Sequence, residues 1–322
     1  MPDIVINNGG VSAVIRTCGA ELRSLVVGGR EIMWAGDPAY WGKVSPLLFP
    51  VIGFLRGDTA VFDGMSVPLG KHGFARDMEF SVTHPGTTVQ NDTTAQGGTT
   101  AQPGTTAQPG TAAQPGTAAQ PGDSATFTLT HTEETREHFP YKFVLALTYR
   151  LTGAGVSIDY TVTNRDVRPM PYCIGAHPAF ACAVDKSRLV FEKAETVNGP
   201  VMDVSSGLWN ADNRVLRLDN SREFPLAYPL FDNDCVYFDK LESTSVLLAS
   251  GSAGGVRVSW SGFNSLGVWT PAGKNAPFVC IEPWRGTNDY TDEYGEFSGK
   301  RDVDILPAGE SRVYNMTVEL VS

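Results

Sequence analysis

Short segments in which apolar and polar residues alternate recur along this chain, and turn-forming residues separate them. The clearest pair, residues 144–151 and 156–163, flanks a short turn at 153–155. A period of two is typical of strands with one buried face, so this pair predicts a hairpin. Comparable strand segments lie at 245–249, 256–260, 266–270, 278–281 and 312–320.

Helical periodicity over ten or more residues is hard to find, and only residues 288–295 indicate a short helical turn. Many short strands without intervening helices predict a β-sandwich or barrel rather than a doubly wound sheet. At roughly 150 residues per domain, 322 residues would suggest two domains, although large all-β proteins often use this length for one. The pattern therefore establishes the class as all-β and leaves the domain count open.

A low-complexity insertion interrupts the strands. Residues 93–122 are five copies of a six-residue unit of the type TTAQPG, with no charge and no aromatic side chain. Such a segment buries too little apolar area to offset its ordering entropy, so we expect a flexible loop at about 87–124. The flanking residues 79–83 and 126–130 alternate like strands, which favours a surface loop over a domain linker.

Charge and targeting signals narrow the compartment and the partners. The formal net charge of −10 argues against electrostatic binding to nucleic acid or to an anionic membrane. The first residues lack the basic and apolar regions of a secretory signal, and the longest apolar stretch, 47–55, is too short to span a bilayer. We therefore expect a cytoplasmic protein. Its five cysteines, odd in number and without a C-x-x-C spacing, predict reduced thiols rather than disulfides or a zinc site.

Three segments carry residues suited to chemistry: 71–77 (KHGFARD), 174–180 (IGAHPAF) and 278–284 (FVCIEPW). The simpler interpretations are a hydrogen-bonding His72 in a loop, an Arg76 paired with Asp77, and a His177 satisfied within the core. Glu282 is harder to explain in this way, because a carboxylate is rarely buried without a partner. Strand alternation would place it on one face with Trp284.

An acid and a base facing one cavity, beside a Trp that could stack on a sugar, suffice for proton transfer on a carbohydrate. Burial and a neighbouring cation can together tune Glu282 as a base, and His177 can act as the acid. No phosphate-binding loop, dinucleotide fingerprint or G-x-S-x-G motif occurs, and no H-x-H spacing indicates a metal. We therefore expect neither cofactor nor metal.

Together, the ordered segments resemble the aldose 1-epimerase (galactose mutarotase) family, most closely its LacX-type branch. They are residues 19–22 (GAEL), 40–41 (YW), 46–50 (PLLFP), 72–77 (HGFARD), 177–180 (HPAF) and 281–284 (IEPW). The resemblance covers nearly the whole chain outside the repeat. It implies one large β-sandwich domain of the galactose mutarotase type over residues 1–322, and interconversion of the α and β anomers of an aldose.

The resemblance also implies roles for the catalytic groups. Glu282 resembles the general base that removes the proton from the C1 hydroxyl, and His177 the general acid that protonates the ring oxygen. His72 resembles a second histidine that hydrogen-bonds the substrate near the ring oxygen. The side chains of His177 and Glu282 should project into one cavity, from opposite sides of a bound sugar ring.

Further residues correspond to substrate-binding positions of the family. Arg56 matches the arginine after the PLLFP segment, which other relatives carry two positions earlier, where this chain has Phe54. Asp234 resembles the carboxylate that holds sugar hydroxyls, with Asp232 as a competitor. Arg76 either binds substrate or braces its loop, and Trp284 is the candidate stacking surface.

The expected substrate is a neutral aldose such as galactose or glucose, because the sequence shows no evident basic cluster for a phosphate. Two alternatives stay open. One is a hexose-6-phosphate mutarotase, and the other is a non-catalytic carbohydrate-binding or regulatory protein on the same fold. The oligomeric state is expected to be monomer or homodimer.

Overall fold

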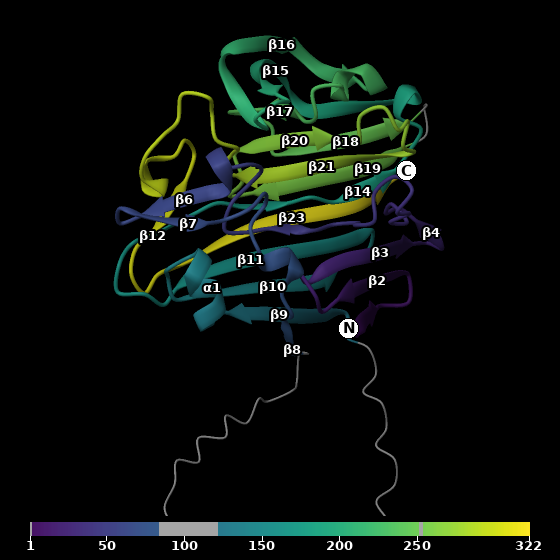
Figure 1. Cartoon of the computed structure of the whole chain (residues 1–322). Coiled ribbons are helices and arrows are strands. Elements are labelled where there is room, and N and C mark those ends of the chain that lie inside the picture. Colours follow the sequence, from purple (N-terminus) through teal and green to yellow (C-terminus); the bar gives the residue numbers. More distant parts are fainter. Residues whose placement is uncertain (1, 84–121, 251–253) are drawn as a thin grey trace, which may run out of the picture.

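Antiparallel strand pairs build the sheets of the computed structural model, which describes residues 2–83, 122–250 and 254–322. The largest sheet has the strand order β16-β15-β18-β19-β23-β11-β10-β9-β8, and Figure 1 shows it running from β16 at one edge to β8 at the other. Its strands are β8 (Ser81–Thr83), β9 (Ser124–Thr130), β10 (Phe143–Leu151), β11 (Gly155–Asn164), β15 (Ser187–Asp203), β16 (Leu208–Pro225), β18 (Ser245–Ser250), β19 (Gly255–Ser261) and β23 (Ser311–Val321).

Smaller sheets complete the molecule. A six-stranded sheet contains β5 (Leu47–Leu48), β13 (Ile174–Ala176), β14 (Ala179–Ala181), β17 (Val236–Phe238), β20 (Ser265–Trp269) and β21 (Phe278–Arg285). A four-stranded sheet contains β1 (Asp3–Asn7), β2 (Val11–Arg16), β3 (Glu21–Val27) and β4 (Arg30–Glu31). Two further pairs are β6 (Thr59–Phe62) with β7 (Met65–Pro68), and β12 (Met170–Tyr172) with β22 (Asp304–Leu306).

The smaller sheets pack against one face of the nine-stranded sheet. Strand β2 contacts β10, β3 contacts β11, and β17 contacts β15. Alternate residues of β10 and β11 are buried, as the period of two predicted, and they join a continuous apolar core with the other sheets. The expected all-β sandwich is confirmed. Burial of this alternating face is the main stabilising contribution to the fold.

The strands that flank the insertion pair with each other. Ser81 of β8 lies opposite Thr128 of β9, so the two segments predicted from their alternation are neighbours in one sheet. The repeat itself, and the flexible loop expected at about 87–124, fall outside the described residues apart from the last few positions. The strands expected at 144–151 and 156–163 are also confirmed, as the hairpin β10–β11.

Local helical structure differs from the sequence expectation. The α-helix of the described residues is α1 (Glu133–His138), where Thr132 and Thr135 form a reciprocal capping box. Residues 288–295 form no helix. Six residues are too few for periodicity to reveal α1. No helix in the described ranges is long and apolar enough to cross a membrane. All five cysteines lie in those ranges, and each is a free thiol.

Candidate active site

Strand register brings His177 and Glu282 together. Glu282 lies in β21, and His177 lies at the corner between β13 and β14, both of which pair with β21. Gly175 lies opposite Trp284, and Ala179 lies opposite Cys280. The same register sets position 177 opposite position 282, although more than a hundred residues separate the two along the chain.

The two side chains meet in a buried polar contact. His177 Nε2 lies 3.3 Å from Glu282 Oε2, and the residues are 7% and 1% exposed. Both line a cavity of about 410 Å³. His177 Nδ1 and Glu282 Oε2 have no hydrogen-bond partner within the described residues. The two groups lie side by side, too close for a sugar ring to fit between them, and these two unpaired atoms are themselves buried.

Burial sets the protonation of this pair. Desolvation raises the pKa of Glu282 well above its usual value, Asp234 raises it further, and the positive charge of Lys71 acts in the opposite direction. Desolvation also lowers the pKa of His177 to about 3. Both shifts favour the uncharged forms, a neutral imidazole beside a protonated carboxyl.

Aromatic rings hold the imidazole of His177 in place. It stacks on Trp41, with ring centroids 5.0 Å apart, and meets the edge of Trp269 at 5.7 Å. Both tryptophans line the cavity. No sequence pattern indicated these contacts, because residues 41 and 269 lie far from residue 177 along the chain.

His72 contributes a second imidazole to the cavity. Its Nδ1 accepts a hydrogen bond of 3.0 Å from the Gly53 amide, so a neutral His72 carries its proton on Nε2, which is then a donor. Burial is the main reason that its pKa lies well below the usual value, and the charges of neighbouring groups lower the pKa further. Its φ of +66° is followed by +70° at Gly73, where an added Cβ would lie 2.2 Å from the Phe49 carbonyl oxygen. Only glycine fits this turn.

Asp234 and Lys71 form a charged pair in the cavity wall. Asp234 follows the 3-10 turn η4 (Tyr228–Phe231) and adopts a φ of +69°. Its Oδ2 lies 3.7 Å from Lys71 Nζ. The competing Asp232 is exposed and does not line the cavity. Lys71 was part of a segment suited to chemistry, but nothing in the sequence singled out its side chain.

Comparisons with known proteins decide the family. A family model described as aldose 1-epimerase matches residues 2–111 and 114–318. The chain belongs to the aldose 1-epimerase family. The chromosomal protein LacX of Lactococcus lactis subsp. lactis is 29% identical, over 98% of this chain and 99% of its own length.

Solved structures agree with this assignment to the aldose 1-epimerase family. A galactose mutarotase-like protein from Lactobacillus casei superposes with a TM-score of 0.82 at 29% identity, covering 99% of this chain and 100% of its own. A galactose mutarotase related enzyme from Lactobacillus acidophilus has a TM-score of 0.82 at 25% identity, covering 100% and 98%. The expected family resemblance, its LacX-type branch and the galactose mutarotase type of β-sandwich are therefore confirmed.

Two of the residues that the family resemblance singled out lie at the cavity in constrained settings. Arg76 donates a 2.8 Å hydrogen bond from Nη2 to the Lys71 carbonyl, and its Nε lies 3.4 Å from Asp77 Oδ2. Trp284 is 3% exposed and stacks on Tyr237, with ring centroids 5.5 Å apart. A Cβ on Gly267 would lie 2.5 Å from the Trp284 ring. Trp284 therefore has little open ring surface, and its Nε1 has no hydrogen-bond partner in the described segments.

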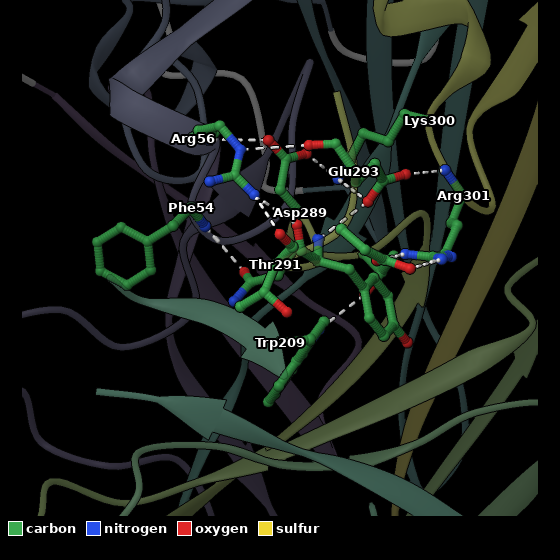
Figure 2. Close-up of polar contacts among 12 residues, drawn as sticks. Phe54, Arg56, Trp209, Asp289, Thr291, Glu293, Lys300 and Arg301 are labelled. Carbon is green, nitrogen blue, oxygen red and sulfur yellow. Dashed lines mark hydrogen bonds and ion pairs between the residues drawn. The ribbon is translucent and has the colours of Figure 1, made fainter. Parts of the chain in front are cut away.

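Unlike His72, Arg76, Asp234 and Trp284, Arg56 does not line the cavity. Its guanidinium donates to the main-chain carbonyls of Tyr290, Thr291 and Glu293, as Figure 2 shows for the surrounding network. Its guanidinium carbon also lies 4.3 Å from the centre of the Tyr294 ring. The side chain is thus occupied in bracing the loop after β21. Phe54, at the alternative position of the family's arginine, does line the cavity.

Among the described residues, one group of potential metal ligands lies at the candidate acid–base pair. His177, Cys280 and Glu282 each offer one atom within 4.8 Å of the others. Metal ligation requires a thiolate, and burial raises the pKa of Cys280 well above its usual value, with the Glu282 charge adding to the shift. Cys280 packs in an apolar cluster with Trp34 and Phe278. The donor chemistry therefore does not favour a metal here.

Proposed function

We propose that this member of the aldose 1-epimerase family interconverts the α and β anomers of a neutral aldose, such as galactose or glucose. The observation that carries the proposal is the contact of 3.3 Å between His177 Nε2 and Glu282 Oε2 at the wall of one cavity. The C1 hydroxyl oxygen and the ring oxygen of an aldose are bonded to the same carbon. An acid and a base that serve these two oxygens must therefore lie close together, as this pair does.

Ring opening then proceeds by paired proton transfers. Glu282 takes the proton of the C1 hydroxyl while His177 gives a proton to the ring oxygen, and the C1–O5 bond breaks to leave the free aldehyde. Rotation about the C1–C2 bond presents the other face of the aldehyde. Closure reverses both transfers, so the pair ends with the proton it began with.

The buried environment of the pair governs where its proton lies. Burial favours the proton on Glu282, because this arrangement leaves both groups uncharged. Before ring opening the proton must therefore move from Glu282 to His177 across their 3.3 Å contact, and Glu282 is protonated again as the ring opens. Burial thus favours the open-chain intermediate over the ion pair that precedes it.

Other cavity residues position the sugar. His72 offers its Nε2 proton near the ring oxygen, and Asp234 accepts from hydroxyl groups. Trp284 forms part of the cavity wall but has little open ring surface for stacking. Trp41 and Trp269 provide apolar wall around the acid–base pair.

Anomerisation of freshly dissolved α-glucose and α-galactose, followed by polarimetry or NMR, tests the proposal. Wild type should equilibrate at least one sugar well beyond the buffer rate, and Glu282→Gln should lower kcat by at least about 100-fold, the lower range for a lost general base. If wild type and Glu282→Gln are equally inert with neutral and phosphorylated sugars, the enzyme proposal fails and only the carbohydrate-binding alternative remains.

A second candidate substrate is a hexose phosphate, and a cluster of cations favours it. Lys43, Lys71 and Arg76 all line the cavity. Lys43 Nζ lies 2.9 Å from Asp77 Oδ1, so Lys43 and Arg76 converge on one carboxylate as they would on a phosphate. The sequence did not indicate this cluster because Lys43 lies far from the other two. The same assay with glucose 6-phosphate and galactose 6-phosphate decides: kcat/KM should exceed that of the neutral sugar if the cluster binds phosphate.

A further inference from the structure

We propose that Lys71 and Asp234 together bind one hydroxyl group of the sugar, so that Lys71, and not Arg56, supplies the substrate-binding cation of this site. This inference rests on the proposed function and adds a residue that decides how the sugar is held. It follows from three features: where the guanidinium of Arg56 is committed, where the ammonium of Lys71 lies, and how far that ammonium is from Asp234.

The Arg56 guanidinium is held away from the cavity. Its Nη2 donates to the Tyr290 and Thr291 carbonyls at 3.1 and 2.8 Å, and its Nε donates to the Glu293 carbonyl at 3.2 Å. Its main-chain amide donates to Asp289 Oδ2 at 2.8 Å. A guanidinium held at this loop cannot also reach the cavity.

Lys71 places its ammonium group at the cavity wall. Lys71 Nζ lies 4.2 Å from the centre of the Phe54 ring, a cation–π distance. Both residues line the cavity, and Phe54 occupies the alternative position of the family's arginine. The cation at the cavity therefore comes from the loop that carries His72. It lies over Phe54, the position at which some relatives carry their arginine.

The spacing between Lys71 and Asp234 suits a bridging hydroxyl. The 3.7 Å between Lys71 Nζ and Asp234 Oδ2 is longer than a hydrogen bond. In the described part of the chain, Lys71 Nζ donates no hydrogen bond, and Asp234 accepts none with its carboxylate. A hydroxyl accepts from one partner and donates to the other, and an oxygen about 2.8 Å from each would bridge them. Both bonds would be charge-assisted and therefore stronger than neutral ones.

Backbone geometry fixes both ends of this bridge. Asp234 has a φ of +69°, and His72, directly after Lys71, has a φ of +66°. Such conformations are uncommon outside glycine and persist where the surrounding structure imposes them. The Lys71 carbonyl is held by Arg76 Nη2 at 2.8 Å. The main chain at both residues is thus set before a sugar arrives, which reduces the entropic cost of binding.

Electrostatics around the catalytic pair supports this placement. The charge of Lys71 lowers the pKa of His72, His177 and Glu282 alike, although burial is the largest influence on each. An ammonium that acts on all three groups lies near the point where the reacting oxygens would be held.

The test combines single and double variants on the sugar that wild type turns over best. Lys71→Met should lower kcat/KM by about 10- to 100-fold, the effect of losing a hydrogen bond to a charged group. Lys71→Arg should restore most of it. Lys193→Met serves as the matched control, since Lys193 lies in β15 with its Nζ on the Glu242 carbonyl, and it should match wild type.

A double-variant cycle separates a shared hydroxyl from two independent effects. If Lys71 and Asp234 hold the same hydroxyl, Asp234→Asn should cost much less in the Lys71→Met background than in wild type. Strictly additive losses, or a Lys71→Met variant as active as Lys193→Met, would overturn the proposal.

Calorimetry, which measures sugar binding directly, separates failure of the hydroxyl bridge from failure of the proposed enzyme function. If wild type anomerises no sugar but binds one, the enzyme assignment fails, and weaker binding by Lys71→Met still upholds the hydroxyl bridge. Equal binding by Lys71→Met and wild type, or no sugar binding by wild type, refutes it.

Discussion

Glu282 couples the stability of the protein to pH. Burial raises its pKa well above the ordinary value of 4.5, so the folded state keeps a proton that the unfolded chain releases once the pH exceeds that value. The free energy of unfolding of wild type therefore decreases as the pH rises above 4.5. We predict that the Glu282→Gln variant, which cannot titrate, becomes progressively more stable than wild type as the pH rises above the ordinary value of 4.5. Urea unfolding at several pH values measures the difference.

Glu137→Gln is the control for this experiment, because Glu137 is exposed at the surface of α1. Its difference from wild type should stay constant with pH. A constant difference for Glu282→Gln as well would mean that the folded state does not hold this proton. His177 acts in the other direction: its pKa of about 3 lies below the unfolded value, so its contribution to stability is lost as pH falls below about 6.5.

The loop after β21 depends on Arg56. Phe54 N donates to Asn288 Oδ1 at 2.8 Å, and Lys300 Nζ binds Asp289 Oδ1 at 2.5 Å, so the start of this loop is tied on both sides (Figure 2). We predict that Arg56→Met lowers the free energy of unfolding by about 1–3 kcal/mol, since main-chain carbonyls lose their donor. The fall should appear as a lower urea midpoint.

Arg16→Met is the matched control, since Arg16 is 37% exposed and pairs with Asp3 at the surface. It should change stability by under about 0.5 kcal/mol. Loss of activity in Arg56→Met without loss of stability would instead support the substrate-binding role that the family resemblance implied.

The sequence predicted the strands more completely than it predicted the contacts of the candidate active site. Alternation located β10, β11 and β23 because each strand has at least nine residues and buries alternate side chains. Glu282 stood out because it interrupts an apolar strand. The tertiary contacts of Lys71 and Arg56 could not be predicted from the sequence, because side chains in loops show no hydrophobic periodicity. Their partners, Asp234 and the carbonyls of residues 290–293, are distant in sequence.

At the scale of the whole molecule, the nine-stranded sheet supports a second layer that carries the proposed acid–base pair. Glu282 lies in the six-stranded sheet, His177 lies at the corner between its strands β13 and β14, and Asp234 comes from the turn before its edge strand β17. The cations Lys43, Lys71 and Arg76 come from the loops around β5 and the 3-10 turn η2 (Ala75–Asp77). All three lie within ion-pair distance of a carboxylate, Lys43 and Arg76 of Asp77 and Lys71 of Asp234.

The insertion enters the sheet at an edge, and its removal tests how far the sandwich depends on it. Strands β8 and β9 pair directly, with Thr83 opposite Thr126. Because loop-closure entropy varies slowly with length, deleting four repeat copies, residues 93–116, should change the free energy of unfolding by less than about 1 kcal/mol. Anomerisation activity should stay at the wild-type level. Urea unfolding and the anomerisation assay measure the two outcomes.

A slightly longer deletion, residues 93–123, provides the contrast. It removes Gly122, whose carbonyl accepts from Asn7 N at 3.2 Å, and Asp123, whose carbonyl accepts from Leu151 N at 2.8 Å. These bonds tie the start of β9 to β1 and to the end of β10. The longer deletion should therefore cost about 1–3 kcal/mol more than the shorter one. Equal stabilities for the two deletions would show that the anchoring of β9 does not depend on these contacts.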